Sequence, residues 1–191
     1  MRRLARELES SPMALYGHVR DKDELLVALL DRRAAELPKP VLPNDPRERL
    51  LALYGLLFAS LSQHPWIVPI LLKGDLSGPS IFWLVDAILG SFLAAGLPPE
   101  RAAAAYHVVW RYTVGEISVR QASTDRRAAI SREPLITTLQ RGVEVAELPH
   151  LAALGEPMAA AREGLDFHEG LAAVIDGVLG WRGSADPSEA G

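Results

Sequence analysis

Apolar residues recur at intervals of three and four positions along most of the chain, and no stretch alternates apolar and polar residues for long enough to form a strand. The widest apolar stripe extends from Leu50 to Leu61, after a proline at position 46 that suits the first turn of a helix. The pattern therefore predicts an all-α protein. Helices are expected over residues 22–37, 46–63, 66–73, 80–95, 98–121, 134–147 and 167–181, with a polar, mobile segment at 123–132.

Prolines divide this series of helices into two regions. A capping box formed by Asp21 and Glu24 begins the helix over residues 22–37, and Pro38 ends it. Further prolines at positions 40, 43 and 46 stiffen the segment that follows. We therefore predict a head with a connector helix over residues 1–37 and a helical body over residues 46–182.

Charge and composition limit the cellular compartments and the binding partners that are consistent with the sequence. The net charge is −4, but residues 1–22 contain five cations and three acids and are net +2, which leaves −6 for the remainder. An imbalance this small also arises by chance, yet it would let the head, and not the body, approach a polyanion. The chain has no cysteine, and its apolar stripe of twelve residues is too short to span a bilayer. A cytoplasmic protein without disulfides is expected.

Residues that would carry catalysis or hold a metal are not grouped in the sequence. His64, His107, His150 and His168 lack metal-ligand spacing. There is no Ser or Cys nucleophile signature, no glycine-rich phosphate loop and no close pair of carboxylates apart from those that cap helices. No metal or cofactor is expected, and an enzyme is the less favoured class of protein.

Aromatic side chains are concentrated in the helices between residues 46 and 122. Packing of the core accounts for part of this concentration. The functional interpretation is a ligand cavity, because such cavities are mostly apolar with a few polar groups that orient the ligand. The predicted ligand-binding residues are Tyr54, Phe58, His64, Trp66, Trp83, Tyr106, His107, Trp110 and Arg111.

The first 26 residues contain two short helical patterns joined by Glu9-Ser10-Ser11. In the first, Leu4 and Leu8 lie four residues apart on one apolar side, and the arginines at positions 2, 3 and 6 fall elsewhere. In the second, Tyr16 and His18 are followed by cations at positions 20 and 22, so that hydroxyl, imidazole and charge can all contact phosphates. The arrangement predicts a helix-turn-helix whose second helix reads DNA.

Three segments of this head resemble the DNA-binding domain of the tetracycline-repressor (TetR) family. They are Arg-Leu-Ala-Arg-Glu-Leu at 3–8, Ser-Pro-Met-Ala-Leu-Tyr at 11–16 and His-Val-Arg-Asp-Lys-Asp-Glu-Leu-Leu at 18–26. Residues 112–115 and 167–177 resemble the dimerisation helices of the same repressors. Family members have a complete helix before the one that begins here at Arg2. We therefore expect the chain as given to bind DNA far more weakly than a chain extended upstream.

The resemblance and helix geometry together assign roles within the head. Arg2 is expected to reach a base edge, the start of the second helix to enter the major groove, and Tyr16, His18 and Lys22 to hold phosphates. The usual turn, roughly Leu-Gly-Val, is replaced here by Leu8-Glu9-Ser10, and Gly17 stands where relatives often carry a bulky or basic side chain. The predicted DNA-binding residues are Arg2, Arg3, Ser11, Pro12, Met13, Ala14, Tyr16, Gly17, His18 and Lys22.

The resemblance also implies an inducer pocket and a two-fold dimer. Tetracycline-binding members coordinate a drug-bound Mg²⁺ through a His, but the corresponding stretch here is Pro69 to Leu72, which contains none. The expected inducer is therefore a small apolar or aromatic molecule other than tetracycline. A monomer could bury the apolar residues of the last helix internally, but the resemblance implies that they pair across the two-fold with the long helix around Gly115. These residues are Phe167, Leu171, Val174, Ile175 and Val178.

Together these observations predict a ligand-responsive transcriptional repressor that binds operator DNA as a homodimer and is released by a small-molecule inducer. The proposed switch is a tilt of the connector helix, so that the two heads no longer match the half-sites. The first alternative is a helical small-molecule binding or interaction module that has lost DNA binding. A helical enzyme is the second alternative.

Overall fold

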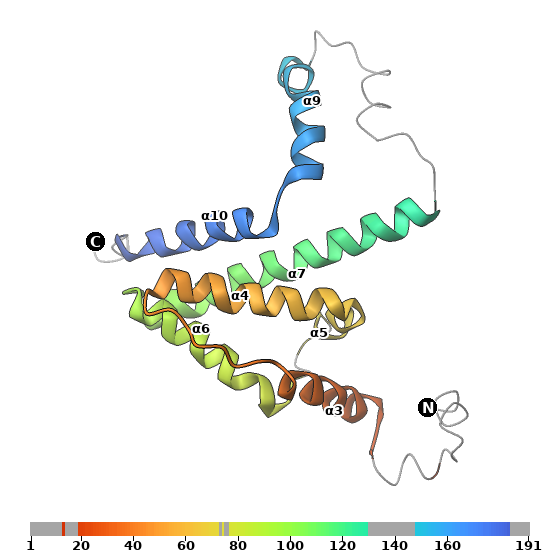
Figure 1. Ribbon diagram of the computed structural model, residues 1–191, viewed down its shortest axis with the longest axis vertical. Coiled ribbons are helices and arrows are strands. Elements are labelled where there is room, and N and C mark those ends of the chain that lie inside the picture. Colours follow the sequence, from red (N-terminus) through yellow and green to blue (C-terminus); the bar gives the residue numbers. More distant parts are fainter. Residues whose placement is uncertain (1–12, 14–18, 73, 75–76, 130–147, 184–191) are drawn as a thin grey trace, which may run out of the picture.

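In the computed structural model, the described part of the chain comprises residue 13 and residues 19–72, 74, 77–129 and 148–183. All regular structure within these ranges is helical, which confirms the all-α prediction (Figure 1). The helices are α3 (Lys22–Ala35), α4 (Pro46–Gln63), η1 (Pro65–Ile67), α5 (Val68–Leu71), η2 (Pro79–Ile81), α6 (Phe82–Ala94), α7 (Pro99–Ala129), α9 (Pro149–Gly164), α10 (Phe167–Leu179) and η4 (Gly180–Gly183).

An aspartate caps the start of each of the first two helices, and one of them, Asp21, was predicted to do so. The Asp21 side chain accepts a hydrogen bond from the backbone N–H of Glu24 at 2.8 Å, and Asp45 accepts one from Glu48 at 2.9 Å. Each carboxylate satisfies a backbone N–H that has no partner inside its own helix. Pro46 occupies the first turn of α4, where its missing N–H carries no penalty.

Helix α4 forms the centre of the body and packs against α6, α7 and α10 (Figure 1). Its buried residues recur at helical spacing, as the apolar stripe predicted. The side chains with almost no exposed surface come from all four helices and from α5, and they form one core. The largest of them are Tyr54, Phe92, Phe167, Leu50, Leu53, Leu84, Ile88, Leu171, Ile175, Val68 and Val109.

The segment between α3 and α4 runs beside α6 and is held at two points (Figure 1). Arg49 donates to the carbonyl oxygens of Pro43 at 3.0 Å and Asn44 at 2.8 Å. Nearer α3, the Lys39 ammonium lies 5.5 Å from the ring centre of Trp83 on α6. A cation over an aromatic face is attracted to it, so the linker is tied to α6 as well as to α4.

Two helices differ from the sequence predictions. Helix α7 continues to Ala129, through most of the segment that was expected to be polar and mobile, because residues 122–129 contain no Gly or Pro and are rich in Ala and Arg, which favour helix. Helix α9 was not predicted at all, since Pro157 in its interior is a helix-breaking signal. The predicted helix at 134–147 lies outside the described residues.

No single helix in the described ranges is long and apolar enough to cross a membrane. Helix α4 and the η1–α5 segment, which are bent by 95° relative to each other, pass that test as a pair by length and composition.

Candidate functional site

Most of the predicted DNA-binding residues lie outside the described part of the chain. This applies to Arg2, Arg3, Ser11, Pro12, Ala14, Tyr16, Gly17 and His18. Met13 is described and is 84% exposed, and Lys22, the first residue of α3, is also exposed. Their roles on DNA remain predictions.

The start of the connector helix α3 is organised by an exposed ion pair. The backbone N–H of Arg20 donates to Glu24 Oε2 at 2.5 Å, and its Nε donates to the same oxygen at 3.3 Å. The backbone hydrogen bond, with the guanidinium beside it, holds the pKa of Glu24 below its usual range. Arg20 is therefore partnered within the protein, and Lys22, the first residue of α3, is exposed.

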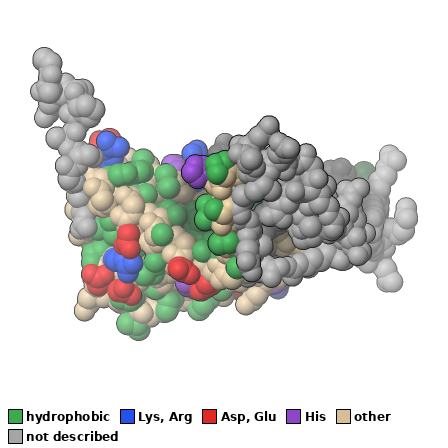
Figure 2. Space-filling view, turned by 90° about the horizontal axis from the view of Figure 1, so that it is seen from above, with side chains coloured by type: hydrophobic (Ala, Val, Ile, Leu, Met, Phe, Trp, Pro, Cys, Tyr) green, Lys and Arg blue, Asp and Glu red, His purple; other side chains and the backbone are tan. Residues whose placement is uncertain are grey.

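The surface of the body offers no broad basic area on the face seen in Figure 2. Hydrophobic side chains cover much of its described part, and acidic and basic side chains lie among them in small groups. A surface of this kind has little attraction for the phosphates of DNA.

The predicted ligand-binding residues fall into different environments. Tyr54 is fully buried, and its hydroxyl donates to the backbone carbonyl of Tyr106 at 3.2 Å. Burial raises the pKa of Tyr54 and, to a smaller extent, that of Tyr106. The Tyr106 ring meets the His107 ring edge to face at 5.2 Å. Tyr54 and Tyr106 thus meet between α4 and α7, whereas His107, the next residue along α7, is exposed.

Phe58 belongs to a stack of aromatic rings. It lies parallel to Phe167 with ring centres 3.7 Å apart, and Tyr112 stacks on the same Phe167 at 5.7 Å. The Tyr112 hydroxyl donates to the carbonyl of Phe167 at 3.3 Å, and the Arg120 guanidinium lies 5.3 Å from the Phe58 ring centre. The stack joins the beginning of α10 to α4 and α7. Sequence reasoning did not assign Tyr112 or Phe167 to it, because stacking across three helices leaves no local signal.

The remaining predicted ligand residues are dispersed. His64 lies at the junction of α4 and η1, Trp83 lies under Lys39, Trp110 is half-buried on α7, and Arg111 is exposed beside it. Trp66 is 43% exposed and lines a depression of about 300 Å³. The other residues lining that depression are Leu29, Arg32, Arg33 and Glu36 of the connector region.

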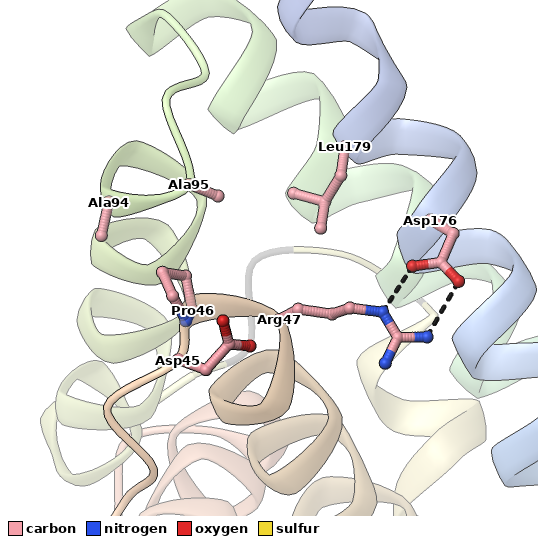
Figure 3. Close-up of a pocket in the computed structure, with 7 residues that line it drawn as sticks. All are labelled: Asp45, Pro46, Arg47, Ala94, Ala95, Asp176 and Leu179. Carbon is pink, nitrogen blue, oxygen red and sulfur yellow. Dashed lines mark hydrogen bonds and ion pairs between the residues drawn. The ribbon is translucent and has the colours of Figure 1, made fainter.

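A second depression, of about 390 Å³, lies where the start of α4, the end of α6 and α10 meet (Figure 3). Across it Arg47 donates to both carboxylate oxygens of Asp176, at 2.5 and 2.8 Å. These hydrogen bonds hold the pKa of Asp176 below its ordinary value and raise the pKa of Arg47. None of the predicted ligand residues lines this depression. Within the described ranges, no group of three His, Cys, Asp or Glu side chains is arranged to hold a metal ion.

The apolar face of α10 is not available to a partner chain, contrary to the sequence prediction. Phe167, Leu171 and Ile175 are fully buried in the core of their own chain, Val178 is nearly so, and Val174 is half-buried. The reason is that α10 lies across both α4 and α7, and its wide apolar face covers them. Amphipathic periodicity shows that a face is buried but does not show against which chain.

Comparison with known proteins settles the family. The family model described as tetracyclin repressor-like, C-terminal domain matches residues 39–180. The chain therefore belongs to the tetracycline-repressor family.

Several known regulators are similar to it. An HTH-type transcriptional regulator of Saccharopolyspora erythraea is 29% identical over 153 residues, covering 80% of this chain and 64% of the relative. The HTH-type transcriptional repressor DrrR1 of Streptomyces coeruleorubidus is 28% identical over 189 residues, covering 93% and 68%. The chain thus spans about two thirds of the length of these curated relatives, which are transcriptional regulators rather than enzymes.

A solved structure extends the comparison to three dimensions. The crystal structure of the Streptomyces coelicolor TetR family protein ActR in complex with actinorhodin matches with a TM-score of 0.77 and 25% sequence identity. The match covers 96% of this chain and 88% of that chain. The helical body described above is therefore the fold of this family.

Proposed function

We propose that the protein is a ligand-responsive transcriptional repressor that binds operator DNA as a dimer in the cytoplasm and is released by a small-molecule inducer. The observation that carries this proposal is the structural match over 96% of the chain to a TetR family protein with a ligand bound. The relatives with similar sequences are a transcriptional regulator and a repressor.

DNA binding is assigned to the N-terminal head. Arg2 would contact a base edge, whereas Tyr16 and Lys22 would contact phosphates. Tyr16→Phe should therefore weaken binding to all DNA sequences, while Arg2→Ala should relax specificity at one position, with about 1 to 3 kcal/mol of discrimination lost. A gel shift with DNA adjacent to the gene, compared with scrambled DNA of equal length, measures both effects. Unchanged affinity and specificity in these variants would contradict the assignment.

The proposed inducer is an apolar or aromatic molecule that binds without a metal. Support comes from the aromatic residues of α4, α6 and α7 and from the actinorhodin bound to ActR. Actinorhodin is the first probe to test by thermal unfolding, with and without a chelator. A ligand at about 100 times its dissociation constant stabilises by roughly 2.7 kcal/mol, or about 5 to 11 °C in a chain of this size. Stabilisation that disappears with the chelator would contradict the metal-free proposal.

The proposed dimer uses the outer faces of α7 and α10. On α7, Val108 and Val119 are exposed, the latter by 62%, and a Cβ added at Gly115 would meet no neighbouring atom. On α10, Ala173 and Gly177 are exposed on the side away from the core. Apolar and small side chains on two adjacent helices suit close packing around a two-fold axis. Such a dimer would place two heads at a spacing set by the DNA helix.

One alternative function is favoured by a specific observation. The turn Leu8-Glu9-Ser10 places a side chain where family members have Gly and a polar group where they have Val, and Gly17 removes a side chain from the helix that reads DNA. A helical ligand-binding module that has lost DNA binding would show these changes. In that case actinorhodin or a similar molecule would still stabilise the protein, but the protein would retard no specific DNA fragment.

A further inference from the structure

The connector helix α3 supplies a cap for the helix that follows η2. Asp31 on α3 accepts a hydrogen bond through Oδ1 from the backbone N–H of Ser80 at 2.7 Å, across 49 positions of sequence. Ser80 belongs to η2, which continues directly into α6, and the residue before η2 provides no side-chain cap. Backbone N–H groups at the start of a helix have no partner within it. The partner here comes from the connector helix.

Gly78 allows this approach. Its φ of −97° and ψ of 170° are open to any amino acid, so backbone conformation does not explain the glycine. A Cβ at this position would instead overlap the Cβ, Cγ and Oδ1 atoms of Asp31. Gly78 is buried, and the side chain of Asp31 rests directly on its backbone. A side chain at position 78 would therefore force helix α3 and the start of the η2–α6 segment apart.

A second contact lies at the same end of α6. Lys39, in the linker shortly after α3, covers Trp83 in the first turn of α6. The remainder of α6 is anchored in the core, where Leu84, Ile88 and Phe92 are almost completely buried. The beginning of α6 is thus tied to the connector region, and its length is packed against the helices that carry the predicted ligand residues.

We propose that the contact of Asp31 with Ser80 and Gly78 is the joint through which a displacement of α6 moves the connector helix α3. This inference rests on the proposed function, because it assigns the regulatory step of that function to named residues. Nine residues separate Asp31 from Lys22, which is about 13.5 Å along a helix. A rotation of about 10° about Asp31 would therefore move Lys22 by roughly 2.4 Å, enough to break a hydrogen bond to a phosphate.

Two substitutions break the joint by different routes. Asp31→Ala removes the acceptor, and Gly78→Ala pushes the two segments apart while leaving the carboxylate in place. Asp31→Asn keeps an oxygen acceptor and serves as the conservative variant. The matched control is Gly90→Ala, because Gly90 is an exposed residue of α6 and a Cβ there would meet no neighbouring atom.

Hydrogen exchange on the complete chain tests the joint without ligand or DNA. The Ser80 amide is expected to exchange about tenfold faster or more in Asp31→Ala and Gly78→Ala, the scale of losing a hydrogen bond to a charged acceptor. Asp31→Asn is expected to exchange at a rate closer to that of the parent, and Gly90→Ala at the parent rate. Unchanged exchange at Ser80 in both joint variants would overturn the proposal.

The regulatory part is tested by the affinity for a DNA fragment with and without actinorhodin. In both joint variants the ratio of the two affinities should fall toward one, and Gly90→Ala should keep the parent ratio. If both joint variants keep the same ratio of DNA affinities without and with actinorhodin as the parent, the proposal is overturned even if exchange at Ser80 has changed. If the parent itself does not respond to actinorhodin, the proposed inducer class fails. In that case hydrogen exchange alone tests the joint. The α3 amides must exchange faster in Gly78→Ala than in Gly90→Ala, and equal exchange rates in the two variants would overturn the proposed joint.

Discussion

Mutations on the two faces of α10 should affect different properties: folding stability on the buried face and dimerisation on the exposed face. Ile175 is fully buried between α10 and the helices beneath it, whereas Ala173, two residues earlier, is exposed on the outer side. Ile175→Ala removes buried carbon atoms and leaves a cavity, which costs about 2 to 5 kcal/mol of folding free energy. In a chain of this size that loss lowers the melting temperature by roughly 4 to 20 °C.

Ala173→Arg is expected to leave the folded subunit almost unchanged, because an exposed substitution usually alters stability by less than about 0.5 kcal/mol. Its effect should appear in association. If the outer face of α10 packs against its two-fold copy, each interface receives two guanidinium groups without partners. A penalty of about 3 kcal/mol weakens the dimer more than a hundredfold, since about 1.4 kcal/mol corresponds to a factor of ten.

Sedimentation over a range of concentrations, combined with thermal unfolding, separates the two effects. Ile175→Ala should melt earlier, and Ala173→Arg should sediment as a folded monomer. A variant Ala173→Arg that remains as dimeric as the parent would refute the assignment of this face to the interface. Ile175→Ala that dissociates at an unchanged melting temperature would show that the buried face had been placed wrongly.

Three further outcomes are expected. Gly170→Ala should be less stable than the exposed control Gly90→Ala by about 1 to 3 kcal/mol in urea unfolding, because only the methyl group at position 170 would overlap the Tyr112 hydroxyl. Tyr112→Phe should recover part of the difference. The hydrogen bonds from Arg47 lower the pKa of Asp176 below its ordinary value of 3.8. The ion pair therefore stabilises the fold above pH 3.8, and this stabilisation is lost as the pH falls through the lowered pKa. The urea midpoints of the parent and Asp176→Asn should differ at pH 7 and converge in stronger acid. Lys22→Ala should weaken binding to all DNA sequences and reduce the slope of affinity against salt by about one, as measured by titration at several salt concentrations.

Local signals in the sequence predicted the beginnings of helices well. Asp21 and Asp45 each precede a helix by one residue and cap it, because a cap depends only on residues within one turn. The all-α fold followed in the same way from periodicity. Helix α9 was missed because Pro157 contradicts the helical pattern locally, and the rule that a proline ends a helix has exceptions that only the surrounding structure decides.

The arrangement of the candidate sites could not be obtained from such signals. Arg47 pairs with Asp176 across 129 positions, and Asp31 caps Ser80 across 49. No periodicity links residues so far apart, and the three charged residues, Arg47, Asp176 and Asp31, are ordinary exposed or half-exposed side chains when considered alone. The apolar face of α10 illustrates the same limit, since its pattern predicts burial and leaves open whether the covering surface belongs to the same chain.

The central claim is that a small molecule controls the affinity of this protein for DNA. The most direct measurement is the fluorescence anisotropy of a labelled DNA fragment taken from beside the gene, titrated with the protein at fixed salt, with and without actinorhodin. The account expects tight binding to that fragment, weaker binding to scrambled DNA, and a loss of affinity of about fivefold or more when actinorhodin is present, the lower end of typical coupling between two sites. Equal affinity for both DNA fragments, or an affinity for the specific fragment that does not change with any ligand shown to stabilise the body, would contradict it.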